Sequence, residues 1–142
     1  MKSLCTLLFL LLPLACARPD YISSEEWQRL NNPATANSCA GEFKTAHLCA
    51  ILTWTKTPNS TEVQEFVLEL QGDVTVADDL AIILWMPSMG HGSAPVKIEK
   101  ISATQYRVTN VYFIMPGDWE VRLTLKKSGQ VLDQLFIPMM VP

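Results

Sequence analysis

Hydrophobic and polar residues alternate along much of the chain, and this period of two predicts β-strands rather than helices. Every second residue is apolar in residues 66–71 and again in residues 119–126, as in a strand with one buried and one exposed face. Residues 80–86 are instead an unbroken apolar run, which predicts a central strand covered on both faces. The full set of predicted strands covers residues 48–54, 66–71, 80–86, 96–101, 106–115, 119–126 and 130–138.

Turn-forming pairs separate several of these strands. Pro-Asn, Gly-Asp, Pro-Gly and Ser-Gly pairs occur between them, and these residues suit the backbone angles of tight turns. About seven short strands at near-regular spacing predict an all-β fold, an immunoglobulin-like β-sandwich of about seven strands. In the last strand, Val131, Leu135 and Ile137 are expected to face the core.

The start of the chain is predicted to be an export signal, which is set aside from the fold. Lys2 precedes an apolar run of signal-peptide length, and small residues follow that run, as in secretory signals. Cleavage after Ala17 would remove residues 1–17, whereas a lipoprotein signal would comprise residues 1–15 and leave a lipid on Cys16. The sequence leaves both routes open. Either one predicts a protein exported to the periplasm or cell envelope.

Behind the export signal, the chain divides into a polar, irregular segment at residues 18–47 and a sandwich domain at residues 48–142. Although 49% of all residues are hydrophobic, the signal holds a large share of them. No later run approaches the ~20 apolar residues that a membrane-spanning helix needs. We therefore expect no transmembrane helix in the mature chain, and membrane anchoring only through a lipid.

Charge and motifs narrow the classes of function. The net charge is −3 and no basic stripe is present, which argues against nucleic acid as a partner. The chain has two histidines, and it contains neither a Gly-x-Ser-x-Gly elbow nor a phosphate-binding glycine loop, the usual marks of hydrolases and nucleotide enzymes. We therefore expect a binding protein and not an enzyme.

Two of the four cysteines remain once the export signal is set aside. Cys39 and Cys49 are a single pair, and in an oxidising compartment such a pair is expected to form a disulfide. A loop of this size would stabilise the fold by about 2–3 kcal/mol. The alternative is a metal site formed by both thiolates and His47, which lies between them in the sequence.

One loop of the predicted sandwich combines groups that bind soft metals. Met86, Met89 and His91 follow the apolar run; thioethers select Cu(I), and imidazole also binds copper. Met115 lies at a second Met-Pro corner near a strand end, and loops gather at the ends of a sandwich. These four side chains predict a Cu(I) site with three sulfurs and one nitrogen. The competing interpretation is that Met86 and Met115 only fill the core.

Two segments resemble the YtkA-like domain family, which is related to the FixH proteins. They are Leu-Trp-Met-Pro-Ser-Met-Gly-His-Gly at residues 84–92 and Val-Tyr-Phe-Ile-Met-Pro-Gly-Asp-Trp-Glu-Val at residues 111–121. The resemblance covers roughly residues 48–138 and implies a small exported β-sandwich of immunoglobulin type. FixH-like members are linked to cytochrome oxidase assembly beside a copper-transporting ATPase. They carry a transmembrane anchor, whereas for this chain we expect only a leader or a lipid.

These features lead to two hypotheses for the function. The first is an exported cell-envelope protein that binds Cu(I) as a metal chaperone, in copper handling or oxidase metallation. Its partners would be a copper donor or acceptor protein of the envelope. The alternative is a metal-free, non-enzymatic module with a structural or protein-interaction role.

Overall fold

The computed structural model of the chain describes residues 38–142. The predictions for the export signal and for Cys16 therefore lie outside the described residues. The elements are β1 (Gly41–Phe43), β2 (Leu48–Trp54), β3 (Gln64–Gln71), a 3-10 turn η2 (Val74–Val76), β4 (Asp79–Met86), β5 (His91–Gly92), β6 (Lys97–Lys100), β7 (Gln105–Val111), β8 (Gly117–Lys127) and β9 (Gln130–Val141).

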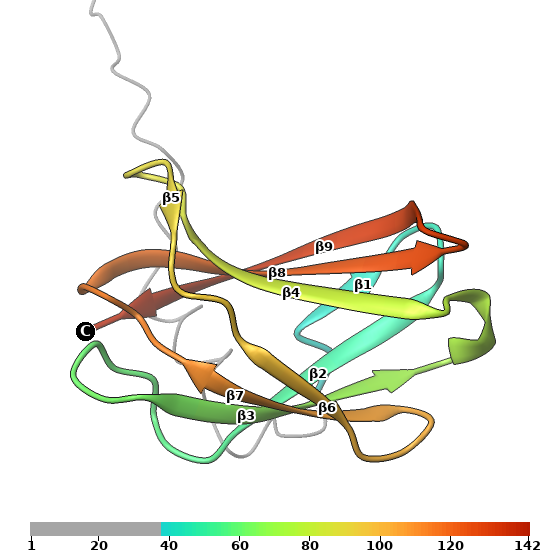
Figure 1. Cartoon of the computed structure of the whole chain (residues 1–142), viewed down its shortest axis with the longest axis horizontal. Helices are drawn as coiled ribbons and strands as arrows, with labels where there is room; N and C mark the ends of the chain where they lie inside the picture. Colours follow the sequence, from blue (N-terminus) through green and yellow to red (C-terminus); the bar gives the residue numbers. More distant parts are fainter. Residues whose placement is uncertain (1–37) are drawn as a thin grey trace, which may run out of the picture.

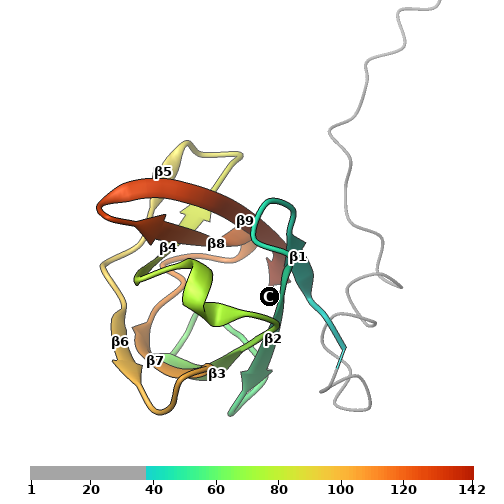
Figure 2. The same cartoon turned by 90° about the vertical axis from the view of Figure 1, so that its right-hand side faces the viewer.

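These strands form two antiparallel sheets that pack face to face, as Figures 1 and 2 show. The first sheet has the order β1-β2-β3-β7-β6, and the second has the order β5-β4-β8-β9. Each of the seven predicted strands overlaps one of the observed strands. The β-sandwich prediction is therefore confirmed. Among residues 38–142, no helix is long and apolar enough to span a membrane.

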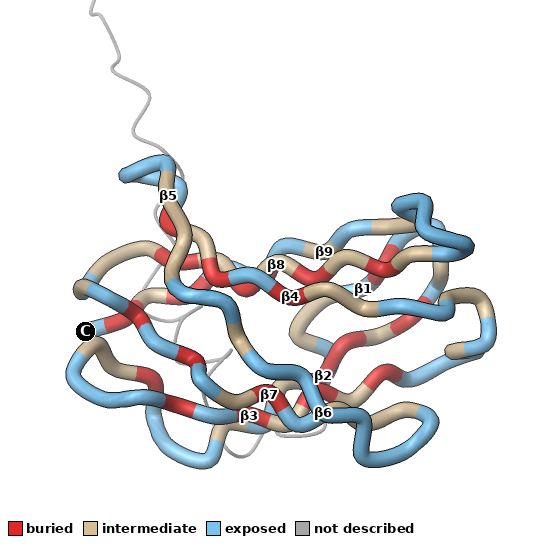
Figure 3. Tube along the Cα trace, viewed as in Figure 1, coloured by how far each residue is buried: buried red, intermediate tan, exposed pale blue. Residues whose placement is uncertain are grey.

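The core follows the alternation in the sequence. Phe66, Leu68 and Leu70 of β3 are almost completely buried, and short buried stretches alternate with more exposed ones along the tube in Figure 3. On β8, the buried positions are likewise every second residue, from Trp119 to Leu125. Each such side chain stabilises the fold by about 1.5–3 kcal/mol relative to an exposed one. Alternation therefore fixes which face of each strand meets the other sheet.

The sandwich begins earlier in the chain than predicted. Strand β1 lies within the segment expected to be irregular, and its Phe43 is completely buried. A strand of three residues is too short to show alternation, so the sequence pattern missed it. Cys39 and Cys49 form the predicted disulfide, with their Cα atoms 5.4 Å apart. This bond links the residues just before β1 to β2, and the two strands are also paired by backbone hydrogen bonds.

The prediction that residues 80–86 are covered on both faces is wrong. Ile82 and Leu84 of β4 face the core, but Ile83 is 51% exposed on the outer face. The neighbouring outer-face residue, Trp85, lies under the guanidinium group of Arg122, whose carbon is 4.8 Å from the ring centroid. The unbroken apolar run therefore reflects one face in the core and one partly covered face.

Residues 106–115 were predicted as one strand, but β7 ends at Val111. Asn110 has a left-handed backbone angle, φ 58°, at the register shift in the pairing of β7 with β3, and Val111 is the last paired residue of the strand. Phe113 is completely buried although it lies beyond the strand. The apolar pattern continues past Val111 because the chain there crosses over the core toward β8, which belongs to the other sheet.

The assignment of one residue of the last strand to the core was wrong. Val131 is 59% exposed, whereas Ile137 is buried and Leu135 packs partly against the core. The pairing of β8 with β9 shifts register between Leu125 and Lys126. At this register shift β9 has one residue more than β8. The extra residue reverses which side chains face the core in the first residues of β9, so Val131 points outward.

Candidate metal site at the β4–β5 turn

A tight turn brings two of the predicted ligands opposite each other. The backbone N–H groups of Met89 and Gly90 both donate to the carbonyl of Met86, at 3.2 and 2.9 Å. The chain then returns as β5, in which His91 is the register partner of Met86. Directly paired residues project from the same face, with Cβ atoms about 4.5–5.5 Å apart. The side chains of Met86 and His91 therefore share the inner face of the sheet.

The indole of Trp119 lies beside this pair. Its ring centroid is 6.4 Å from that of His91, in an edge-to-face arrangement with 71° between the planes. Trp119 is 1% exposed, whereas His91 is half-buried. The imidazole is therefore covered by the indole on one side and reaches the surface on the other.

Trp119 also holds the segment that carries Met115. The indole Nε1–H donates to the carbonyl oxygen of Met115 at 2.9 Å. Phe113 packs edge-to-face on the same indole, with centroids 5.4 Å apart. The side chain of Met115 is partly buried and packs against the core. One buried ring thus contacts both the histidine of the turn and the segment of the third methionine.

Two further contacts join the turn to the start of β8. The Ser88 hydroxyl donates to Asp118 Oδ1 at 2.6 Å. The methyl group of Met86 lies over Gly117, because a Cβ atom on residue 117 would be 2.7 Å from it. Beyond β5, the Ser93 hydroxyl donates to the carbonyl of Tyr112. The backbones of the two Met-Pro corners therefore lie at the same end of the sandwich, as expected from the sequence.

The predicted ligands differ in how accessible they are. Met86 is 2% exposed and Met89 is 60% exposed at the tip of the turn, while His91 and Met115 are half-buried. The structure thus places His91 and the backbone of Met115 against Trp119, with Met86 paired to His91, and it places the side chain of Met89 at the surface. The burial of Met86 also fits the packing interpretation.

The donor set at this end suits a soft cation. Among residues 38–142, no group of three or more His, Cys, Asp or Glu side chains could hold a metal ion. A site at the turn would therefore need the methionine sulfurs, and thioethers with one imidazole favour Cu(I). The disulfide uses both thiols of Cys39 and Cys49, which leaves none for the alternative site with His47.

The hydrogen bond that makes Trp119 part of this end was not predicted from the sequence. The donor at Nε1 and the acceptor at Met115 are only four residues apart. The two groups are therefore close in the sequence, but the hydrogen bond between them forms only because the chain bends between β7 and β8. The pairing of Ser88 with Asp118 was not expected either, since the two residues are 30 positions apart.

Comparison with known proteins identifies one family. A family model described as YtkA-like matches residues 52–124. The matched range contains the β4–β5 turn, the segment of Met115 and Trp119. Among curated proteins, none matches this chain.

Proposed function

The chain belongs to the YtkA-like family, and from this premise we propose that it is a non-enzymatic copper-handling protein of the cell envelope. It would bind Cu(I) at the β4–β5 turn through Met86, Met89, His91 and Met115. The metal is cargo in this proposal, received from one envelope protein and passed to another.

The observation that carries the proposal is the pairing of Met86 with His91 on the inner face. This pairing puts a thioether and an imidazole within a short distance of each other before any metal binds. Trp119 adds an apolar cover on one side, which would shield a bound ion from water. A soft cation with a low hydration requirement matches such a site better than Zn²⁺ or Mg²⁺ does.

The uneven exposure of the ligands supports transfer rather than storage. Met89 stands at the surface, so its sulfur would be the first ligand that a partner displaces. His91 would follow, because its ring reaches the surface beside the turn. A proton competes with the metal for the imidazole nitrogen, so we expect the affinity for Cu(I) to fall on acidification.

The proposed location follows from the leader. An exported chain, either cleaved after Ala17 or carrying a lipid on Cys16, would meet copper outside the cytoplasm. The disulfide between Cys39 and Cys49 agrees with an oxidising compartment. Delivery of copper during oxidase metallation is the role that the family resemblance favours.

Anaerobic titration with Cu(I), in competition with a chromogenic chelator, tests the proposal. We expect His91→Asn and Met89→Leu to bind Cu(I) at least about tenfold more weakly than the wild type, since each removes one ligand of the predicted set. The matched controls are His47→Asn, on the exposed β1–β2 turn, and Met140→Leu, the β9 residue paired with Asp118. Equal affinity in all five proteins would contradict the proposal.

The outer face of the second sheet favours a second candidate function, a metal-free interaction module. Ile83 and Phe136 are 51% and 48% exposed there, and they flank Arg122 in the strand register. Exposed apolar side chains grouped on one face are typical of protein-binding surfaces. Metal analysis of protein purified from copper-supplemented cells distinguishes the two: metal-free protein that co-purifies with a partner would favour the module.

A further inference from the structure

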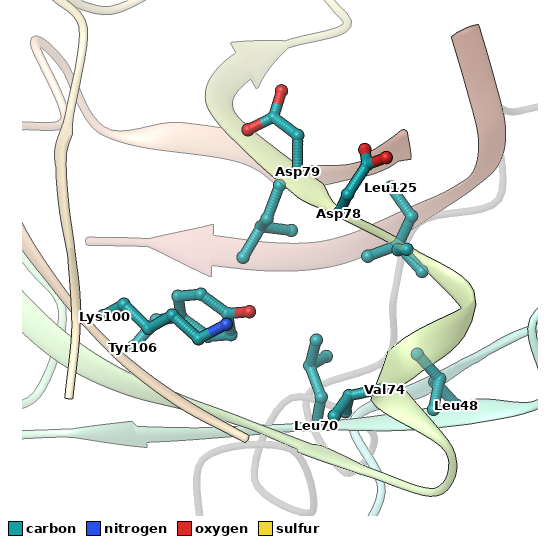
Figure 4. A pocket seen from close by; sticks show the side chains of 10 residues that line it. Leu48, Leu70, Val74, Asp78, Asp79, Lys100, Tyr106 and Leu125 are labelled. Carbon is teal, nitrogen blue, oxygen red and sulfur yellow. The ribbon is translucent and has the colours of Figure 1, made fainter. Parts of the chain in front are cut away.

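A pocket of about 70 Å³ lies between the two sheets at the end opposite the β4–β5 turn. Figure 4 shows it from close by. Asp79 and Leu80, at the start of β4, form part of its wall, whereas Met86 is the last residue of that strand. At ~3.3 Å per residue, the two ends of β4 are about 20 Å apart. The pocket is therefore separate from the proposed copper site.

The floor of the pocket is apolar. It is formed by leucines of three strands, Leu48, Leu70 and Leu125, each at most 2% exposed. Val74 of the 3-10 turn closes one side. Such a surface attracts the hydrocarbon part of a ligand, because burying apolar area is favourable.

Two polar groups converge on the pocket from the first sheet. In Figure 4 the Tyr106 hydroxyl and the Lys100 ammonium group lie next to each other and point toward its centre. The Lys100 nitrogen is 5.6 Å from the centroid of the Tyr106 ring. Within residues 38–142, neither the hydroxyl nor the ammonium group has a hydrogen-bond or carboxylate partner. Both can therefore donate to a ligand.

The two acidic residues of the pocket wall are engaged elsewhere. Asp78 accepts a hydrogen bond from the backbone N–H of Ser128 at 2.8 Å, and Asp79 lies 3.6 Å from the ammonium group of Lys126. In Figure 4 both carboxylates point away from Lys100 and Tyr106. The side of the pocket toward the first sheet therefore presents a positive charge and a hydroxyl donor.

We propose that this pocket binds a small aliphatic carboxylate. The hydrocarbon tail would lie on the leucine floor, and the carboxylate would accept hydrogen bonds from Tyr106 and Lys100. About 10–15 Å³ of such cavity volume holds one water-sized group. The pocket therefore has room for roughly five to seven non-hydrogen atoms, as in a carboxylate with a tail of about two to four carbons. A ligand with so few atoms binds with a Kd of about 1 mM.

Titration of the ¹⁵N-labelled protein with butanoate, followed by two-dimensional NMR, tests the proposal. We expect saturable shifts at backbone amides around Leu70, Leu80 and Tyr106. Butanamide lacks the charge and acetate lacks the tail, so both should bind about tenfold more weakly, as expected when a charge-assisted hydrogen bond or buried apolar area is lost. Because the spectrum also reports on folding, a variant that fails to fold is recognised directly.

Two variants identify the groups that hold the carboxylate. Tyr106→Phe and Lys100→Gln should each weaken butanoate binding about tenfold. The matched control is Lys97→Gln on the same strand, because Lys97 does not line the pocket. No saturable shift at the pocket, equal binding of butanoate and butanamide, or unchanged binding in Lys100→Gln would each overturn the proposal. None of these results depends on whether copper binds at the other end.

Discussion

The methyl group of Met86 occupies the space over Gly117, so that a Cβ atom on residue 117 would lie only 2.7 Å from it. This contact joins the end of β4 to the start of β8. It brings the turn of His91 and the segment of Met115 to one place, and the hydrogen bond from Ser88 to Asp118 strengthens the same junction. The position of Met86, the innermost predicted ligand, therefore depends on a glycine that belongs to another strand.

Gly117→Ala should destabilise the protein and displace Met86. The new methyl group would collide with Met86, and the backbone angle of residue 117, φ 138°, is one that only glycine adopts easily. We expect a loss of about 2–4 kcal/mol in the free energy of unfolding, measured by urea denaturation. Gly129→Ala is the matched control, because Gly129 also has a positive φ, 78°, but its new methyl group would meet no atom within 4 Å. Equal losses in both variants would show that the collision contributes nothing.

Trp119→Phe should loosen the segment of Met115 while keeping an aromatic ring in the core. The variant removes the donor to the carbonyl of Met115 and leaves a small cavity. We expect the free energy of unfolding to fall by about 1–3 kcal/mol. The control is Trp85→Phe, since Trp85 lies on the half-exposed outer face under Arg122. If Trp85→Phe costs as much as Trp119→Phe, the hydrogen bond does not stabilise this end.

The disulfide between Cys39 and Cys49 should stabilise the fold by constraining the unfolded chain. Its two cysteines are 10 positions apart, and a loop of that length is worth about 2–3 kcal/mol. Urea denaturation with and without reductant measures this contribution. Reductant should destabilise the wild type by that amount and leave the Cys39→Ser/Cys49→Ser double variant unchanged. A wild type that is insensitive to reductant, after loss of the bond is verified by mass spectrometry, would contradict this account.

Acid should destabilise the protein through carboxylates that accept hydrogen bonds. The side-chain amides of Gln105 and Gln71 lower the pKa of Glu69, and the hydroxyl and backbone N–H of Thr75 lower the pKa of Asp73. A lowered pKa in the folded state means that the stabilisation is present above the unfolded pKa, about 4, and is lost as the pH falls below it. The thermal unfolding temperature should therefore drop from pH 4 downward.

Glu69→Gln should reduce this drop, because the variant has no carboxylate to protonate at that position. The matched control is Glu65→Gln, at an exposed position of the same strand. Both substitutions should change the drop in unfolding temperature only slightly, since these side chains are at the surface. A drop of the same size in wild type and Glu69→Gln would remove Glu69 as a source of the acid sensitivity.

The sequence predicted the strands well where one face is buried along several residues. In β3 and β8 the alternation itself identifies the inner residues, because packing against the other sheet selects apolar side chains at every second position. The strands that were missed, β1 and β5, have three and two residues, and no period can be read from so few. Their positions are set by pairing with neighbouring strands.

The errors arose where the structure interrupts a simple period. Val131 was placed in the core because the register shift opposite Lys126 leaves no mark in the local pattern. Residues 80–86 were predicted to be covered on both faces because an exposed apolar residue such as Ile83 looks the same in sequence as a buried one. Both errors follow from long-range pairing, which local patterns do not contain.

The candidate site was predicted in part. The rule that loops gather at the ends of a sandwich correctly brought the segment of Met115 near the β4–β5 turn. It did not predict the contacts that hold them together, because those contacts involve Trp119 and Gly117 of β8. Whether the three sulfurs and the imidazole bind one ion stays a prediction.

X-ray absorption at the copper edge of the Cu(I)-loaded protein shows which atoms bind the ion. We expect a first shell of sulfur atoms with one nitrogen, and loss of the nitrogen in His91→Asn with the sulfur shell retained. The control His47→Asn should leave the spectrum unchanged. A first shell of nitrogen and oxygen atoms alone, or the same spectrum in the wild type and His91→Asn, would contradict copper binding at this site.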